Sequence, residues 1–319
     1  MLITEPGEPD TLASGEVPEP VPGPRDLLIQ VAAAGVNRAD LLQRSGHYPP
    51  PAGAPEWPGL EVAGEVLAGP ADWPVGSRVA ALLAGGGYAE RVAVSVDQAL
   101  AVPDGLSSRD AAALPEALAT AWSNFEAAGL RSGEHVLVRG GSGGVGSVAV
   151  QVARHAFGAR VLATAGGPAR VARLQELGVE AAFDHRSDDL VDRVLEATGG
   201  RGVDVVLDVV GAAGLADNLA VLANDGRLVV IGLQRGRRAE LDLGLLLARR
   251  LSVLGTTLRS RPAQEKARIM AGVREHVWPL VADGRIRPVV HAALPLDQAA
   301  EAHRLLESGA VFGKVLLEP

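Results

Sequence analysis

Apolar residues in the first 120 positions occur in short runs that glycine and proline interrupt. Residues 27–31 read Leu-Leu-Ile-Gln-Val between a Pro-Gly-Pro turn and a glycine, which predicts a strand. In residues 88–94 polar and apolar positions alternate, as in a strand with one buried face. Further short strands are expected at 62–67 and 76–80. Strands of this length and spacing indicate an antiparallel, barrel-like β unit.

Beyond residue 120 the pattern changes to strands that alternate with helices. Residues 135–138 predict a buried strand, and residues 145–157 predict a helix with an apolar stripe that includes Val148 and Val152. Continuous apolar strands alternating with helices are typical of a parallel sheet covered on both faces. Further strands are expected at 160–164, 203–210, 228–231 and 251–256, and a further helix at 171–177.

The last sixty residues predict a return to the first domain. After Pro262 the pattern predicts a helix at about 263–282, a strand at 288–294, a helix at 297–307 and a strand at 314–317. The expected organisation is therefore an α/β protein in which residues 1–120 and 263–319 form one discontinuous domain. Residues 121–262 form the inserted domain, a doubly wound parallel sheet of the Rossmann type.

Composition limits the classes of function. Apolar residues make up 47% of the 319 residues and charged residues 21%, an ordinary globular composition. No apolar run approaches the ~18 residues of a membrane-spanning helix, and the N-terminus shows no leader pattern, so we expect a soluble, cytoplasmic protein. The formal net charge of −8 argues against nucleic acid as a general partner.

The chain contains no cysteine. Disulfides, thiolate nucleophiles, iron–sulfur clusters and zinc sites with cysteine ligands are therefore excluded. The seven histidines show no metal-binding spacing. We expect no metal site.

Residues 141–146 read Gly-Ser-Gly-Gly-Val-Gly, a G-x-G-x-x-G pattern between a predicted strand and a predicted helix. In that context the glycines allow a tight turn, a close approach to a pyrophosphate and close helix–sheet packing. The pattern predicts a dinucleotide site. Ser142 has no identifiable His or Asp partner, so we interpret it as part of the loop and not as a hydrolase nucleophile.

The next strand helps to choose the dinucleotide. NAD sites carry an acidic residue near the end of that strand, whereas here it ends Thr-Ala-Gly-Gly-Pro at residues 164–168 and Arg170 follows. A guanidinium can hold a 2′-phosphate. This favours NADPH, although Arg170 on its own is equally typical of a solvated helix position.

Several stretches together resemble the zinc-free quinone oxidoreductases of the medium-chain dehydrogenase/reductase superfamily, over essentially the whole chain. Within that family, the stretches are most similar to the p53-inducible quinone oxidoreductase branch and to zeta-crystallin. It implies a GroES-like barrel as the catalytic domain. The stretches are 33–40 (Ala-Ala-Gly-Val-Asn-Arg-Ala-Asp), 46–51 (Gly-His-Tyr-Pro-Pro-Pro), 58–64 (Pro-Gly-Leu-Glu-Val-Ala-Gly), 115–121 (Pro-Glu-Ala-Leu-Ala-Thr-Ala), the glycine loop and 313–315 (Gly-Lys-Val).

The resemblance also implies a reaction. Zinc-dependent relatives carry zinc ligands where Asn37 and Leu60 stand, so a catalytic zinc with three protein ligands is not expected. Hydride would pass from the nicotinamide of NADPH to a quinone beside Tyr48, with Asn37 as a nearby amide donor, and these two residues are the catalytic candidates. The protein would orient the cofactor and shield the transfer.

The resemblance assigns the cofactor contacts residue by residue. Two positions depart from the family pattern, because Gly167 replaces a serine and His185 replaces a tyrosine near the 2′-phosphate, and Arg186 is a second arginine that could compensate. The implied contacts are Asn37, Tyr48, Thr120, Gly143, Gly144, Val145, Gly146, Thr164, Gly166, Arg170, His185, Gly232, Leu233, Leu258, Ser260, Gly313 and Lys314.

Two other functions stay open. Related zinc-free enzymes reduce enoyl thioesters or enones at a comparable site. A non-catalytic, NADPH-loaded protein that binds RNA or senses redox state is a third hypothesis, for which the arginines around Arg235, Arg237 and Arg238 are the only pointer. We also expect a homodimer, since the apolar strand at 251–256 would lie at a sheet edge.

Overall fold

A computed structural model describes all residues from Met1 to Pro319. By their contacts the residues form two units. The first unit comprises residues 1–119 and 258–319, and the second comprises residues 120–257. No helix in either unit combines the length and the apolar character needed to cross a bilayer.

The second unit is built on one sheet of six parallel strands, in the order β10-β9-β8-β11-β12-β13. Numbered within the unit, this is the strand order 3-2-1-4-5-6 of the Rossmann fold. The predicted doubly wound parallel sheet is therefore confirmed. The strands are β8 (His135–Val138), β9 (Arg160–Ala165), β10 (Ala181–Asp184), β11 (Val203–Asp208), β12 (Leu222–Val230) and β13 (Ser252–Gly255).

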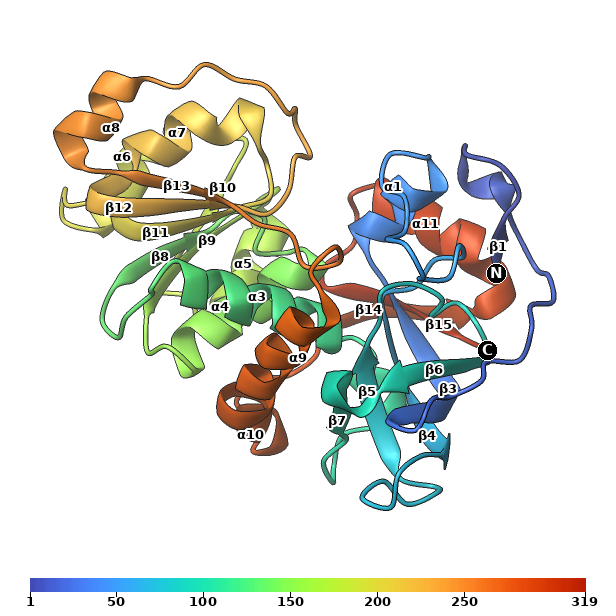
Figure 1. The fold of residues 1–319 in the computed structure, drawn as a ribbon. Coiled ribbons are helices and arrows are strands. Elements are labelled where there is room, and N and C mark those ends of the chain that lie inside the picture. The colour runs from blue at the N-terminus through green and yellow to red at the C-terminus, as the bar shows by residue number, and fades with distance from the viewer. The chain divides into compact units, whose positions relative to one another are not determined.

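Helices cover both faces of this sheet, with α4 and α5 on one side and α6, α7 and α8 on the other (Figure 1). The core between them contains Leu137, Leu162, Phe183, Val206 and Leu228, all almost fully buried. The helices are α4 (Gly144–His155), α5 (Pro168–Glu176), α6 (Leu190–Ala197), α7 (Leu215–Ala220) and α8 (Leu243–Arg249).

The first unit contains a sheet in the order β14-β15-β3-β4-β5-β7, with β6 also paired to β3. All pairs are antiparallel except β14 with β15, which are parallel. The antiparallel arrangement predicted for the first 120 residues is confirmed. The strands are β3 (Asp26–Val36), β4 (Glu61–Ala68), β5 (Arg78–Leu82), β6 (Arg91–Ser95), β7 (Ala99–Ala101), β14 (Val290–Pro295) and β15 (Lys314–Glu318), and β1 (Leu2–Ile3) pairs with β2 (Leu12–Ala13) apart from them.

Strand β3 holds this sheet together. Its N-terminal part pairs with β6, its C-terminal part pairs with β15, and β4 lies along its other edge. Gly64 of β4 lies so close to β3 that a Cβ atom there would come within 1.9 Å of the Gln30 carbonyl oxygen. This contact requires glycine and draws the two strands into a tightly bent pair.

The helical segment after Pro262 differs from the single helix predicted at 263–282. It consists of α9 (Ala263–Gly272), one π turn (Val273–Val277) and α10 (Trp278–Ala282). Pro279 has no backbone N–H to donate to the preceding turn, and the chain widens there. The remaining helices are α1 (Arg38–Arg44), α2 (Ser108–Ala111), α3 (Pro115–Ala127), which crosses the boundary of the units, and α11 (Ala299–Glu307).

Candidate active site

The glycine loop between β8 and α4 is held by the neighbouring strand β9. The Gly141 N–H donates to the Thr164 carbonyl oxygen at 2.8 Å, and the Gly140 N–H donates to Thr164 Oγ1 at 3.1 Å. A Cβ atom on Gly146 would lie 2.1 Å from the Gly140 carbonyl oxygen, so only glycine fits. Thr164, an expected cofactor contact, is buried and uses its polar groups to shape the loop.

Helix α4 begins where this loop ends. The first N–H groups of a helix have no acceptor within it, and here they belong to Gly144, Val145 and Gly146, with the partly exposed Gly143 as the N-cap. Residues 146–153 are buried, which fixes the helix on the sheet. The residues fit a dinucleotide, because unpaired amides at a helix N-terminus bind the pyrophosphate of such a ligand.

Polar side chains also gather where β9 and β10 end. Asp184 accepts hydrogen bonds from the N–H groups of Arg186 at 3.0 Å and Gly167 at 3.1 Å, and these bonds lower the pKa of its carboxyl. A Cβ atom on Gly166 would lie 2.9 Å from Cε1 of His185 and 3.2 Å from Nη2 of Arg186. The Arg186 guanidinium therefore lies beside Gly166, at the end of the strand where a ribose 2′ group is expected.

The charge available at this strand end comes from arginine. Burial lowers the pKa of His185 and so disfavours the charged form of its ring. Arg170 lies in the first turn of α5 and is partly exposed. Arg170 follows Gly166 by four residues in the sequence, and the Arg186 guanidinium lies beside Gly166 in space.

The loops after β11 and β12 lie at the same carboxyl edge of the sheet. Buried Asp208 accepts from the N–H groups of Val210 at 3.0 Å and Gly211 at 2.8 Å, which fixes the loop after β11. Gly232 packs against it, because a Cβ atom there would lie 3.0 Å from the Val209 carbonyl oxygen. Leu233 is 57% exposed, unusual for a leucine beside so ordered a turn.

In the first unit, Asn37, Glu61 and Lys314 form a buried polar group. Lys314 Nζ forms an ion pair with Glu61 Oε1 and donates to Asn37 Oδ1 at 2.6 Å. Asn37 Nδ2 donates to Glu61 Oε1 at 2.9 Å and to the Gly35 carbonyl oxygen at 3.3 Å. Asn37 and Lys314, both expected to contact the cofactor, thus have their polar groups paired inside the protein, with exposed fractions of 7% and 2%.

A second buried chain of hydrogen bonds begins at Asp40. Its carboxylate accepts from the N–H groups of Asn37 and Gly59 and from the Tyr88 hydroxyl. Burial nevertheless raises the pKa of Asp40 to about 6. The Tyr88 hydroxyl also contacts His303 Nε2 at 3.1 Å, so this network ties α1 to α11.

Tyr48 lies against Arg259. The Arg259 guanidinium carbon is 5.5 Å from the centre of the Tyr48 ring, and Nη1 donates to the Tyr48 carbonyl oxygen at 3.3 Å. Arg259 also donates to the Ala84 carbonyl oxygen and to Gln43 Oε1. This buried arginine was not expected as a site residue, and it fixes both the loop and the ring that carry the proposed acceptor contact.

The remaining expected contacts lie in varied surroundings. Leu258 is buried and Ser260 is exposed, on either side of Arg259. Thr120 is partly exposed on α3, and its carbonyl oxygen accepts from Asn124. Gly313 has a φ of 91°, and a Cβ atom there would lie 2.1 Å from the Val289 carbonyl oxygen. Its structural role is to let the chain before β15 lie close to the chain before β14.

These residues do not fit a catalytic zinc ion. Leu60 is apolar and buried, Asn37 is already bonded, and the ammonium of Lys314 adds a positive charge that opposes a divalent cation. The structure contains no group of three or more His, Asp or Glu side chains arranged for a metal. No catalytic step through zinc follows from this donor set.

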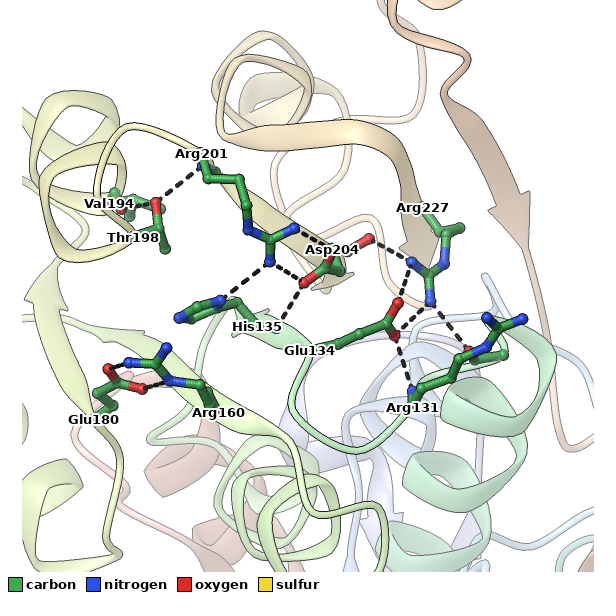
Figure 2. Close-up of polar contacts among 12 residues, drawn as sticks. Arg131, Glu134, His135, Arg160, Glu180, Val194, Thr198, Arg201, Asp204 and Arg227 are labelled. Atoms are coloured by element: carbon green, nitrogen blue, oxygen red, sulfur yellow. Dashed lines mark hydrogen bonds and ion pairs between the residues drawn. The ribbon is translucent and has the colours of Figure 1, made fainter.

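A large charged cluster lies at the opposite, amino-terminal edge of the parallel sheet (Figure 2). Asp204 accepts from the His135 N–H at 2.8 Å and from Arg201. Arg227 donates to both oxygens of Glu134 and to the carbonyl oxygens of residues 128 and 129. These contacts join the starts of β8 and β11 to Arg227 of β12, which pairs with Val205, and we interpret the cluster as a structural clamp.

Sequence reasoning missed Asp184 at the cofactor loop and Glu61 and Arg259 in the first unit. It also missed Glu116, whose backbone N–H donates to Glu61 Oε2 at 3.0 Å. A charged residue within an apolar run was the available signal for Glu116, which lies in Ala-Ala-Ala-Leu-Pro-Glu-Ala-Leu-Ala. The partners of Glu61 and Arg259 lie far away in the sequence, so no local pattern identifies them.

Two protein families match the chain. Residues 23–104 match the alcohol dehydrogenase GroES-like domain, and residues 144–272 match the zinc-binding dehydrogenase family. A quinone oxidoreductase from Rattus norvegicus is 33% identical over 322 residues, which cover 99% of this chain and 96% of that protein.

Longer relatives match as well. A phenolphthiocerol/phthiocerol polyketide synthase of Mycobacterium tuberculosis is 35% identical over 326 residues. The match covers 99% of this chain but only 14% of that protein, so the chain spans a small part of its length.

Solved structures share the whole fold. The quinone oxidoreductase of Escherichia coli complexed with NADPH superposes with a TM-score of 0.85 at 30% identity, covering 99% of this chain and 98% of that one. The CurK enoyl reductase superposes with a TM-score of 0.87 at 27% identity and the same coverage.

Proposed function

Because the chain belongs to the quinone oxidoreductase family of the medium-chain dehydrogenase/reductase superfamily, we propose that it is a zinc-independent reductase that uses NADPH to reduce quinones. The observation that carries the proposal is the glycine loop, in which Gly146 lies against the Gly140 carbonyl oxygen at the N-terminus of α4. When bound, NADPH supplies a hydride to the acceptor.

The second unit holds the cofactor in this proposal. The unpaired amides of Gly144, Val145 and Gly146 bind the pyrophosphate. Gly143 is the N-cap beside them, and its own N–H donates to the Gly140 carbonyl oxygen at 3.0 Å. Gly166 leaves room for the ribose, and Arg170, Arg186 and His185 surround its 2′-phosphate. Thr164 acts on the cofactor indirectly, because its hydroxyl accepts from the Gly140 N–H and so fixes the glycine loop. Gly232, Leu233, Leu258, Ser260 and Thr120 would contact the nicotinamide end.

The first unit positions the acceptor in this proposal. Tyr48 contacts the acceptor, and Arg259 holds its ring and backbone in place. Asn37 and Lys314 act as positioning residues, because their polar groups already hold Glu61 and each other.

An enoyl-thioester or enone reductase is the second candidate. The similarity to the CurK enoyl reductase and to polyketide synthases favours it. A reduced quinone takes up protons at oxygen and an enoyl thioester takes up one at carbon, so the two acceptors separate the candidates.

A binding protein without turnover is the alternative from another class. Arg235, Arg237 and Arg238 are exposed in one loop, whereas Arg227, Arg249 and Arg250 are engaged by acceptors within the second unit. The net charge of −8 also opposes RNA binding. This alternative requires tight NADPH binding, no oxidation with any acceptor, and salt-sensitive RNA binding.

We also propose a homodimer that forms through β13. This strand lies at the edge of its sheet, and Val253 on it is 43% exposed. Leu243 and Leu247, on the helix just before it, are 65% and 80% exposed. An unpaired apolar edge next to exposed leucines suits a second copy of the chain.

The decisive experiment follows the absorbance of the reduced nicotinamide. NADPH and NADH are compared with an ortho-quinone and a crotonyl thioester, for the wild type and for Arg170→Ala and Arg186→Ala. We expect faster oxidation of NADPH with the quinone, and a preference for NADPH that falls about tenfold in each variant, the cost of one charge-assisted contact. Faster turnover of the thioester would favour the second candidate, and binding without any turnover would favour the third.

A further inference from the structure

Glu116 carries a carboxyl group without a partner, next to the paired side chains of Glu61, Lys314 and Asn37. It lies in the first turn of α3, where its backbone N–H donates to Glu61 Oε2 at 3.0 Å. Its own carboxyl oxygens form no hydrogen bond and no ion pair within the chain, and the residue is partly exposed. Glu61, by contrast, is fully buried and paired with Lys314 and Asn37.

The surroundings of Glu116 favour its neutral acid form. Burial is the main cause and the charge of Glu61 the second, and together they raise the pKa of Glu116 to about 8. Asp40 adds to the effect, whereas Lys314 and Lys266 oppose it. These four residues come from β4, α1, β15 and α9, so charged groups from four separate elements influence this carboxyl.

Lysine occurs at only two positions in this arginine-rich chain, Lys266 and Lys314. Both are buried, and both act on Glu116. Lys266 is 5% exposed and forms no hydrogen bond or ion pair within the chain, and burial lowers its pKa. An ammonium can release and regain a proton in such a place, whereas a guanidinium remains charged.

Glu116 is also coupled electrostatically to the residue that holds Tyr48. Arg259 contacts the Tyr48 ring, and both Glu116 and Lys266 interact with the charge of Arg259. The geometry gives a further link, because Glu61 accepts from both the Glu116 N–H and Asn37 Nδ2. The unpartnered acid therefore adjoins the buried polar group that contains Asn37, the second catalytic candidate.

We propose that Glu116 is the acid that protonates the reduced acceptor and that Lys266 stabilises the carboxylate left behind. This role rests on the function proposed above. The acceptor gains a hydride, with its two electrons, from NADPH and becomes an anion. The Glu116 O–H bond then breaks, the proton bonds to the anion, and the charge of Lys266 stabilises the Glu116 carboxylate until water reprotonates it.

The first test is the pH dependence of turnover. With wild type, kcat falls above about pH 8 as Glu116 loses its proton. Glu116→Gln, which keeps the neutral shape, lowers kcat about 100-fold and removes the alkaline limb, the size expected for loss of a general acid. Glu116→Asp restores part of the rate and the alkaline limb. Glu126→Gln, an exposed glutamate on the same helix, leaves both unchanged.

The second variant tests the ammonium. Lys266 lowers the pKa of Glu116, so Lys266→Met shifts the alkaline limb of the profile to higher pH. A lysine with a purely structural role would change stability and leave the position of that limb alone.

A third measurement needs neither cofactor nor turnover. Infrared difference spectra of the cofactor-free protein between pH 6 and pH 10 report the carbonyl band of a protonated carboxyl. We expect a band that disappears with a midpoint near pH 8, is missing in Glu116→Gln and moves to higher pH in Lys266→Met.

The outcomes separate this inference from the proposed function. If wild type reduces quinone or thioester while Glu116→Gln keeps the same rate and pH profile, the role of Glu116 is wrong and the function stands. An infrared titration with no Glu116 band would also overturn the role. If no acceptor is reduced by wild type, the proposed function fails and the role of Glu116 fails with it.

Discussion

Single atoms decide whether the cofactor loop can form. A methyl group at Gly146 would meet the Gly140 carbonyl oxygen at 2.1 Å and the Gly141 Cα atom at 2.8 Å. Both are backbone atoms at the start of a packed helix, so they cannot turn aside as a side chain can. The loop therefore depends on the absence of one carbon atom.

Gly146→Ala is expected to weaken NADPH binding strongly and to destabilise the second unit by about 1–3 kcal/mol, the usual cost of overpacking. Fluorescence titration with NADPH and thermal unfolding measure the two effects. Glu196→Ala is the control, because Glu196 is exposed on α6 of the same unit, away from the cofactor loop and from β13. Equal behaviour of the two variants would show that the close contact at Gly146 is unimportant.

At the residue scale the sequence predicted the glycines but not the pairing of the polar side chains. The G-x-G-x-x-G pattern is local, so each glycine could be assigned from its spacing alone. The bond between Lys314 and Asn37 joins residues 277 positions apart, and nothing near either residue in the sequence indicates it. Asn37 and Lys314 were consequently expected to face the cofactor, whereas their polar groups face each other.

At the scale of elements, the strands with β-branched and leucine-rich sequences were predicted well. Residues 135–138 match β8, and β9 exceeds the predicted range by one residue. β10 was missed because it is short and reads Ala-Ala-Phe-Asp, with little β-branched character. Only its place beside β9 in a continuous sheet makes it a strand.

The edge strand β13 gives a prediction at this scale. Val253→Lys places a charge on the exposed edge, where charged side chains oppose pairing between sheets. We expect the wild type to sediment as a dimer at micromolar concentration and the variant to sediment as a monomer. A surface change away from this edge, such as Val75→Lys at a 72% exposed position, serves as the control. A wild-type monomer would remove the proposed dimer.

At the scale of the molecule, the fold class followed from the change of pattern near residue 120. The first unit matches the GroES-like domain that the resemblance implied, and the second has the expected strand order. The hydrophobic pattern could not predict the strand order of the sheet in the first unit. The pairing of β3 with β6 and β15 depends on contacts between segments that are distant in the sequence.

The network around His303 links the stability of the first unit to pH. Arg44 can only donate, so His303 Nδ1 accepts from it and Nε2 carries the hydrogen that Tyr88 receives. A second proton would face the Arg44 guanidinium. Burial is the larger cause and Arg44 the second, and together they lower the pKa of His303 to about 3.

Between pH 6.5 and about pH 3, His303 is therefore protonated in the unfolded chain and neutral in the folded chain. The stability from His303 is present above pH 6.5 and is lost as pH falls. Relative to His303→Gln, wild type should lose about 2–3 kcal/mol between pH 6.5 and pH 4.5. Urea unfolding of both proteins at several pH values measures the difference between their free energies of unfolding. Asp40 and Glu116 contribute to both proteins with the opposite pH dependence, so their contributions cancel in this difference. A difference independent of pH would contradict the buried neutral ring.

The pairing of β3 with β15 has a consequence for synthesis on the ribosome. Residues 120–257 form a contiguous unit and can fold while translation continues. The first unit has to wait, since β3 is made before the second unit and its partner β15 is made after it. Until then the nascent chain carries an open strand edge, and Glu61 lacks the ammonium that neutralises it. The sheet begun before the second unit is therefore completed only after it, and during that interval β3 depends on protection from aggregation.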